Sequence, residues 1–273
     1  MKTRIVLFAL LFTGVVSYGQ QDAQFTQYMY NTININPAYA GSRGALSVFA
    51  LHSTQWVGLD GAPVTNAVSV NTPFNNSRLG LGVSVINDRI GPTHENTIST
   101  DLSYTIPTSV NVKLSFGIKA TANLFDLDVS RLNPVDSDPS LQNFNNKFSP
   151  NIGAGVYLHS DKAYVGLSIP NFIETNRYDD NEVAIFKEKI NYYLIAGYIL
   201  DMFNEKFVVG IAYRWSSAVS AIVGFQVSEA LYLGYGYDFE TTNLDNYNSG
   251  SHEIFLRYEL FRNNNKMTTQ RFF

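Results

Sequence analysis

The sequence predicts a transmembrane β-barrel, because three observations agree. The chain begins with the pattern of an export signal, its composition is poor in charge and rich in aromatic residues, and many segments alternate strictly between apolar and polar residues. A tilted membrane strand needs about 9–11 residues, which matches these segments. The predicted fold class is all-β: an antiparallel up-and-down barrel of about 12 strands with long extracellular loops, or about 14 strands if 110–132 contains an extra bend.

The first 19 residues have the layout of a secretory signal peptide. Lys2 and Arg4 precede an apolar run over 5–16, and small residues follow at 17 and 19, where a signal peptidase would cleave. The run is too short for a membrane-spanning helix, which needs about 20 residues. We therefore expect residues 1–19 to be removed and the mature protein to reach the outer membrane of a Gram-negative cell.

Composition narrows the function classes. Without the two signal-peptide cations the 19 basic residues fall to 17 against 23 acidic ones, a net charge near −6, which argues against a nucleic-acid partner. Charged residues are 15% of the chain, below the roughly 25% of a soluble domain, whereas Tyr and Phe number 17 and 19. The chain has no cysteine, which excludes disulfides and a lipid-anchored lipoprotein.

Alternating segments define the barrel over 44–262. In one of them Ile98, Leu102 and Tyr104 alternate with Ser, Thr and Asp residues. Charges such as Asp101 and Lys119 fall on the polar face of their strands, as expected where the other face meets lipid. The predicted strands are 44–52, 62–71, 79–88, 96–106, 110–123, 150–159, 162–169, 188–200, 206–215, 217–226, 229–239 and 252–261.

Long polar connections alternate with short turns, which indicates long loops outside the cell and short turns in the periplasm. The long set is 53–61, 89–95, 124–149, 170–187 and 240–251; the short set is 72–78, 107–109, 160–161, 201–205 and 227–228. Residues 20–43 lack clean alternation and either hang in the periplasm or fold into the lumen. Residues 263–273 form a polar C-terminal tail.

No set of residues suits catalysis, a cofactor or a metal. The four histidines are scattered without metal-ligand spacing: His52, His94, His159 and His252. No nucleophile elbow or phosphate loop is present, and pairs such as Gly80 and Gly82 lie inside alternating strands, where they are interpreted as small lumen-facing residues. The acidic pair Asp136 and Asp138 lacks the spacing of a calcium loop. The sequence therefore predicts no enzyme.

Several short sequence motifs are too distinctive to be explained as ordinary strand sequence. They are Gln27-Tyr28-Met29, Asn36-Pro37-Ala38-Tyr39-Ala40-Gly41, Gln55-Trp56-Val57-Gly58, Gly61-Ala62-Pro63 and Asn87-Asp88-Arg89-Ile90-Gly91-Pro92. In this order and spacing they resemble the PorP/SprF family of type IX secretion system outer-membrane proteins, from about residue 22 onward. The family-motif residues, structural or partner-contacting, are Asn36, Pro37, Ala38, Tyr39, Gly41, Gln55, Trp56, Gly58, Gly61, Pro63, Asn87, Asp88 and Gly91. One departure is His52-Ser53, where a basic residue is expected beside the Gln-Trp pair.

The resemblance implies a function that periodicity cannot give. Family members lie in the outer membrane of gliding and related bacteria and are required for secretion, or surface attachment, of large adhesin-like proteins with a C-terminal sorting domain. The expected partners are outer-membrane lipid, that secreted protein or its sorting domain, and other type IX secretion components. Trp56, Phe144 and Phe148 are candidate outer-loop contacts, because polypeptide interfaces use large aromatic anchors. For Trp56 the interpretation as a membrane-interface anchor is favoured over a partner contact, because an aromatic girdle at the membrane edge needs such residues.

Two other classes fit part of the pattern. A diffusion porin needs an open, charged lumen, whereas bulky side chains occupy the predicted lumen positions Tyr157, Tyr164, Tyr193, Tyr232 and Phe255, which indicates a filled or narrow interior. A soluble secreted β-sandwich also alternates, but the export signal, the low charge and the strand length favour the barrel.

Overall fold

The computed structural model describes residues 31–75, 77–128, 130, 143–161, 163–174, 190–198, 207–214, 218–240 and 249–260. The predicted signal peptide, the predicted tail 263–273, the predicted turn 201–205, and most of the predicted loops 170–187 and 240–251 lie outside these ranges. Among the described residues, no helix is both long enough and apolar enough to cross a membrane.

Strands dominate the described chain. Each of the twelve predicted strands has one counterpart in the structure: β1 (Leu46–Thr54), β2 (Val64–Pro73), β3 (Leu79–Ile90), β4 (Thr93–Pro107), β5 (Lys113–Leu127), β6 (Phe144–His159), β7 (Ala163–Ile169), β8 (Tyr193–Tyr198), β9 (Phe207–Arg214), β10 (Ala218–Gln226), β11 (Leu231–Glu240) and β12 (Ser251–Leu260). Two short 3₁₀ helices precede them, η2 (Thr32–Asn34) and η3 (Pro37–Tyr39). Over the described ranges, the predicted number of about twelve strands and their predicted order are confirmed.

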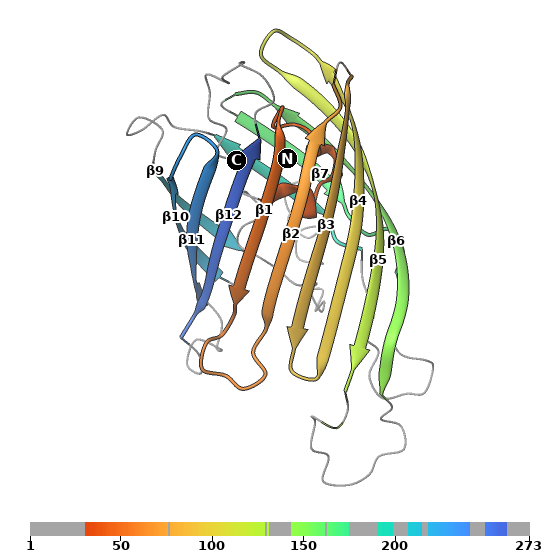
Figure 1. Ribbon diagram of the computed structural model, residues 1–273, viewed down its shortest axis with the longest axis vertical. Coiled ribbons are helices and arrows are strands. Elements are labelled where there is room, and N and C mark those ends of the chain that lie inside the picture. Colours follow the sequence, from red (N-terminus) through yellow and green to blue (C-terminus); the bar gives the residue numbers. More distant parts are fainter. Residues whose placement is uncertain are drawn as a thin grey trace, which may run out of the picture.

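The strands form one antiparallel sheet with barrel topology. Its order is β8-β7-β6-β5-β4-β3-β2-β1-β12-β11-β10-β9, so neighbours in the chain are neighbours in the sheet. The last strand returns to the first, because Leu46 of β1 pairs with Leu260 of β12 and Thr54 pairs with His252. Within the described ranges, β8 and β9 are the two ends of this order. Figure 1 shows the sheet curving around an interior that contains the N-terminal helical turns.

The two faces of the sheet differ as the alternation predicted. Leu102 and Tyr104 of β4 are exposed on the outer face, whereas Asp101 and Ser103 between them are buried on the inner face. The charged residues Asp101, Lys119, Asp238, Glu253 and Arg257 all lie buried inside. Strand parity is therefore confirmed over the described strands.

The predicted loop at 89–95 is wrong. β3 and β4 continue through it and are joined by Gly91 and Pro92, with Gly91 at a φ of 53°. Asn87 pairs with Asn96 in register, and Arg89 pairs with His94. The polar residues of 89–95 mark the end of the apolar outer face, not the end of the strands. Backbone hydrogen bonds between two strands need no apolar side chains, so the pairing continues through this polar segment.

The predicted loop at 124–149 is too long for the same reason. β5 continues to Leu127 and β6 begins at Phe144, with an irregularity in register between Phe125 and Leu127. Phe144 and Phe148 therefore belong to a strand, not to an outer loop. Their predicted position in a loop is corrected, while their role as partner contacts stays a prediction.

Candidate functional site

The first described residues fold against the inner face of the barrel wall. We call residues 31–45 the lumen segment; nearly all of its side chains are buried. Asn36 caps η3, because its side-chain Oδ1 accepts a hydrogen bond from the Ala38 N–H at 3.0 Å. Pro37 follows at the first helical position, where its fixed φ suits a helix start. Gly41, with a φ of 70°, then turns the chain toward β1.

The lumen segment lies on a part of the sheet that carries only glycine and serine. Strand register aligns one row of small residues across five neighbouring strands: Gly80 of β3, Ser103 of β4, Gly117 of β5, Gly155 of β6 and Ser168 of β7. A Cβ atom on Gly117 would overlap the backbone of Pro37 and Ala38, and one on Gly80 would overlap the carbonyl of Ala40. We call this the small-residue row; it lets the lumen segment lie directly on the sheet backbone.

Hydrogen bonds then fix the lumen segment along its length. The Asn36 amide donates to the Val156 carbonyl at 3.1 Å, and the Ser103 hydroxyl donates to the Ala40 carbonyl at 2.6 Å. The Lys119 ammonium donates to the Ile33 carbonyl at 3.1 Å. Each contact joins residues far apart in the chain, so the segment is part of the tertiary fold and not an appended tail.

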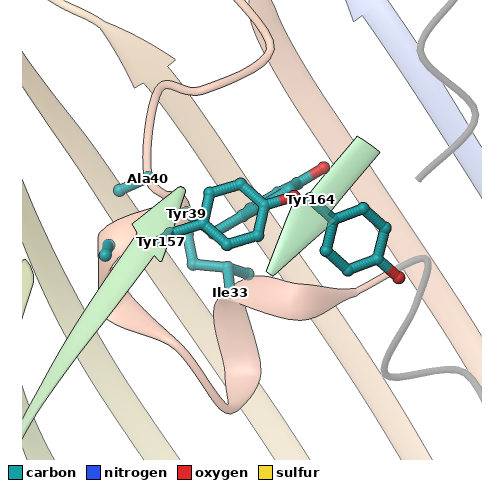
Figure 2. Packing of buried hydrophobic residues seen from close by; sticks show 6 residues of the cluster. Ile33, Tyr39, Ala40, Tyr157 and Tyr164 are labelled. Carbon is teal, nitrogen blue, oxygen red and sulfur yellow. The ribbon is translucent and has the colours of Figure 1, made fainter. Parts of the chain in front are cut away.

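An aromatic cluster packs on the same segment. Figure 2 shows the side chains of Tyr39, Tyr157 and Tyr164 gathered beside Ile33 and Ala40. The Tyr39 and Tyr157 rings meet edge to face with centroids 5.6 Å apart, and Tyr157 lies 5.6 Å from Tyr164. Edge-to-face contacts of this kind add stability beyond that of area burial. The two wall tyrosines were predicted to face the lumen, and both do.

Buried ion pairs balance the charges that the lumen holds. The Lys119 ammonium lies 2.9 Å from Oδ1 of Asp101, and both side chains are almost completely buried. At the other wall, Arg43 of the lumen segment forms an ion pair with Glu259 of β12, which also lies 3.4 Å from Arg257. The segment is thus held to β12 by charge as well as to β3–β7 by packing.

Large side chains occupy the remaining wall near Arg257. Its guanidinium lies over the Tyr232 ring, 4.8 Å from the centroid. The Phe255 ring stacks on Phe49 at 5.6 Å and lies 5.8 Å from Tyr232. A Cβ on Gly234 would overlap Phe255, so small and large residues alternate to let these rings lie flat. Tyr232 and Phe255, both predicted to face the lumen, are among the most buried residues of the structure.

The family-motif residues predicted from the sequence fall into two groups. Asn36, Pro37, Ala38, Tyr39 and Gly41 belong to the lumen segment. The others lie at the far rim, in the β1–β2 connection and the β3–β4 hairpin: Gln55, Trp56, Gly58, Gly61, Pro63, Asn87, Asp88 and Gly91. The structure therefore does not bring them together into a single site.

The rim group is nevertheless tightly connected. The Gly91 N–H donates to the Gly61 carbonyl at 2.8 Å, and the Gln55 N–H donates to the Pro63 carbonyl at 3.0 Å. The Thr65 hydroxyl donates to Asp88 at 2.5 Å inside the barrel. Trp56 is partly buried with a φ of 47°, a conformation uncommon outside glycine. Backbone hydrogen bonds and the contact between the Thr65 and Asp88 side chains thus join the β1–β2 connection to the β3–β4 hairpin.

Sequence reasoning missed several residues that hold the lumen segment. Alternation predicts the inward faces of Asp101 and Glu259 but not their ion pairs, and Arg43 belongs to none of the sequence motifs. The glycines of the small-residue row are interpreted from the sequence only as small lumen residues. Their shared parity on successive strands was visible in the sequence, but the register that aligns them was not.

Three histidines, His52, His94 and His252, lie on the outer face near the rim, and His159 is buried inside. Within the described ranges, no three His, Asp or Glu side chains could jointly hold a metal ion.

Comparison with known families identifies the chain. The model of the type IX secretion system membrane protein PorP/SprF family matches residues 17–202 and 201–258. The protein belongs to this family. The resemblance seen in the motif strings is thereby confirmed, and the PorP/SprF protein described here is a membrane protein of the type IX secretion system. No curated protein matches its sequence.

Solved structures with similar folds are distant. Outer membrane phospholipase A from Escherichia coli is 12% identical, with a TM-score of 0.43 over 77% of this chain and 92% of that one. The KdgM porin is 13% identical, with a TM-score of 0.43 over 79% of this chain and 99% of that one. Values at this level say nothing about the activity of the PorP/SprF chain.

Proposed function

We propose that the protein is a non-enzymatic outer-membrane barrel that supports secretion or cell-surface attachment of a large adhesin-like protein with a C-terminal sorting domain. Its family membership supports a role in type IX secretion. The interior residues favour this role over that of a diffusion porin, because the lumen segment, Tyr157, Tyr232 and Phe255 lie inside the barrel, in space that solutes would need.

The partner would contact the rim at the β1–β2 and β3–β4 connections. There the Gly91 N–H donates to the Gly61 carbonyl, and Trp56 lies in the same β1–β2 connection as Gly61. Aromatic anchors in polar surroundings are the usual centre of a polypeptide interface. Phe148, on the outer face of β6, is 60% exposed and is the second candidate contact. Phe144 begins the same strand and is the third.

The test compares the surface proteome of a deletion strain with that of its complemented parent. We expect viable cells that lack at least one large surface protein and that take up small solutes at the parental rate. Complementation with Trp56→Ala should restore barrel assembly but not full display, whereas Ala120→Ser, on the lipid-facing side of β5, should restore both. An unchanged surface proteome combined with reduced solute uptake would favour the porin instead.

A further inference from the structure

The outer face of the barrel changes chemistry sharply near the rim. Register places one wholly apolar row across seven strands: Leu233, Leu256, Ala50, Val68, Val85, Ile98 and Ala122. The next two rows toward the rim are mostly polar, although Ile254, Val64 and Leu124 also lie in them. We call the following of their polar and aromatic members on β1–β4, β11 and β12 the polar band: His52, Asn66, Asn87, Arg89, His94, Asn96, Tyr235 and His252. On β3 and β4, where both of these rows are polar, the edge of the lipid-contacting surface therefore lies between the apolar row and the polar band.

Side chains of the polar band are organised by hydrogen bonds. The Asn87 amide donates both to Nε2 of His94 and to Oδ1 of Asn96, each at 2.7 Å. His52 Nδ1 lies 2.8 Å from Oδ1 of Asn66, and on β11–β12 the Tyr235 hydroxyl lies 2.6 Å from a His252 nitrogen. Because His94 accepts at Nε2, the neutral imidazole carries its proton on Nδ1, which is a donor.

Arg89 and His94 form the centre of this band. They are register partners on β3 and β4, and both belong to the outward parity, so their Cβ atoms are about 5 Å apart. Arg89 is exposed, and among the described residues none forms an ion pair with its guanidinium. Asp126 lies across from His94 on the side away from Arg89, and its carboxylate accepts the Asn146 N–H at 2.6 Å.

We propose that Arg89 and His94, supported by Asn87 and Asn96, bind the phosphate headgroup of a membrane lipid on the rim side of the bilayer. An anionic phosphate complements a guanidinium beside an imidazole N–H donor. The inference rests on the barrel spanning a membrane and is independent of the proposed secretion role.

The position of the pair selects a lipid rather than a free anion. Val85 and Ile98, four residues below on the same face, are exposed and apolar, as expected for contact with acyl chains. Arg89 lies two residues beyond Asn87, about 7 Å along the strand and about 5 Å along the membrane normal for a tilted strand. That height is within the headgroup layer, which is about 5–8 Å thick on each side.

The experiment uses native mass spectrometry of the full-length protein in detergent, with added phosphatidylglycerol or phosphatidylcholine. Wild type should retain phosphatidylglycerol in preference to phosphatidylcholine. The double variant Arg89→Gln/His94→Gln should lose about tenfold of that preference, the size expected for a charge-assisted contact. The control Arg78→Gln, an exposed arginine in the β2–β3 connection at the opposite end, should keep it.

Three results would contradict the proposal. The first is equal retention of both lipids by wild type. The second is a loss of the phosphatidylglycerol preference in the Arg78→Gln control as large as that in the double variant. The third is displacement of phosphatidylglycerol by inorganic phosphate at matched concentration, which would indicate a free-anion site. Heat-modifiable mobility in gels checks that each variant is folded. If the double variant does not assemble, the single variants Arg89→Gln and His94→Gln are measured, and an undiminished preference in both overturns the assignment.

Discussion

Gly117 illustrates why lumen residues here cannot be exchanged freely. Any side chain at this position would meet the backbone of Pro37 and Ala38, which cannot move aside as a flexible side chain could. The same holds at Gly80 beneath Ala40. Glycine in a strand normally weakens it, so its presence in the small-residue row is explained by close backbone approach.

Gly117→Val should destabilise the barrel or expel the lumen segment. Overpacking costs about 1–3 kcal/mol, and the upper end is expected here because backbone atoms are in the way. The measurement is the urea midpoint of unfolding in detergent micelles, together with protease access to residues 31–45. Ala120→Val, outward on the same strand, is the control and should shift neither. An unaltered midpoint and protection in Gly117→Val would show that the segment does not lie on this row.

The Asp101–Lys119 pair is the second residue-scale feature open to test. Asp101→Asn leaves the Lys119 ammonium buried without its counter-charge, which should cost about 3–5 kcal/mol. The double variant Asp101→Leu/Lys119→Met removes both charges and should be more stable than the single variant. Denaturant titration of the three proteins gives the comparison. A single variant as stable as wild type would mean that the pair is hydrated rather than buried.

At the scale of elements, strand length and membrane contact are separate properties. β3 and β4 extend past the apolar row that contains Val85 and Ile98, and they carry Arg89 and His94 on the same outward face. Alternation between apolar and polar residues indicates where lipid contact ends, and the strand continues beyond that point. Outward residues of one strand therefore sample different depths of the bilayer.

This depth dependence predicts different tolerance to charge along β4. Leu102→Arg places a cation in hydrocarbon and should cost about 2–4 kcal/mol, whereas Asn96→Arg, six residues toward the rim on the same face, should cost about 0–1 kcal/mol. The readout is the yield of heat-modifiable barrel in the outer-membrane fraction. Equal yields from the two variants would place the apolar boundary elsewhere.

At the scale of the whole molecule, the chain ends hold the fold together. β1 pairs with β12, so the barrel topology forms only after nearly the entire chain has been made. The Arg43–Glu259 ion pair adds a link between the lumen segment and the last strand. Contacts of such large sequence separation carry a high loop-closure entropy, and slow folding is expected.

Orientation in the membrane is a further prediction for the whole molecule. The β1–β2 connection should face outside, and the β4–β5 connection should face the periplasm, because long loops are typical of the outer side. The chain has no cysteine, so in the single variants Asp60→Cys and Ser109→Cys the introduced residue is the only one that a maleimide can label. On intact cells an impermeant maleimide should label the first and not the second. The reverse pattern would invert the barrel.

Alternation along the chain was sufficient to predict the strands, their order and the faces of Asp101, Lys119 and Tyr157, because a period of two follows from local backbone geometry. It left two alternatives for residues 20–43, and in the structure the described part, 31–43, lies in the lumen. That placement depends on register, which aligns Gly80, Gly117 and Gly155 from three strands. Register arises from pairing between distant segments, so only the tertiary structure decided which small residues form one row and what lies upon it.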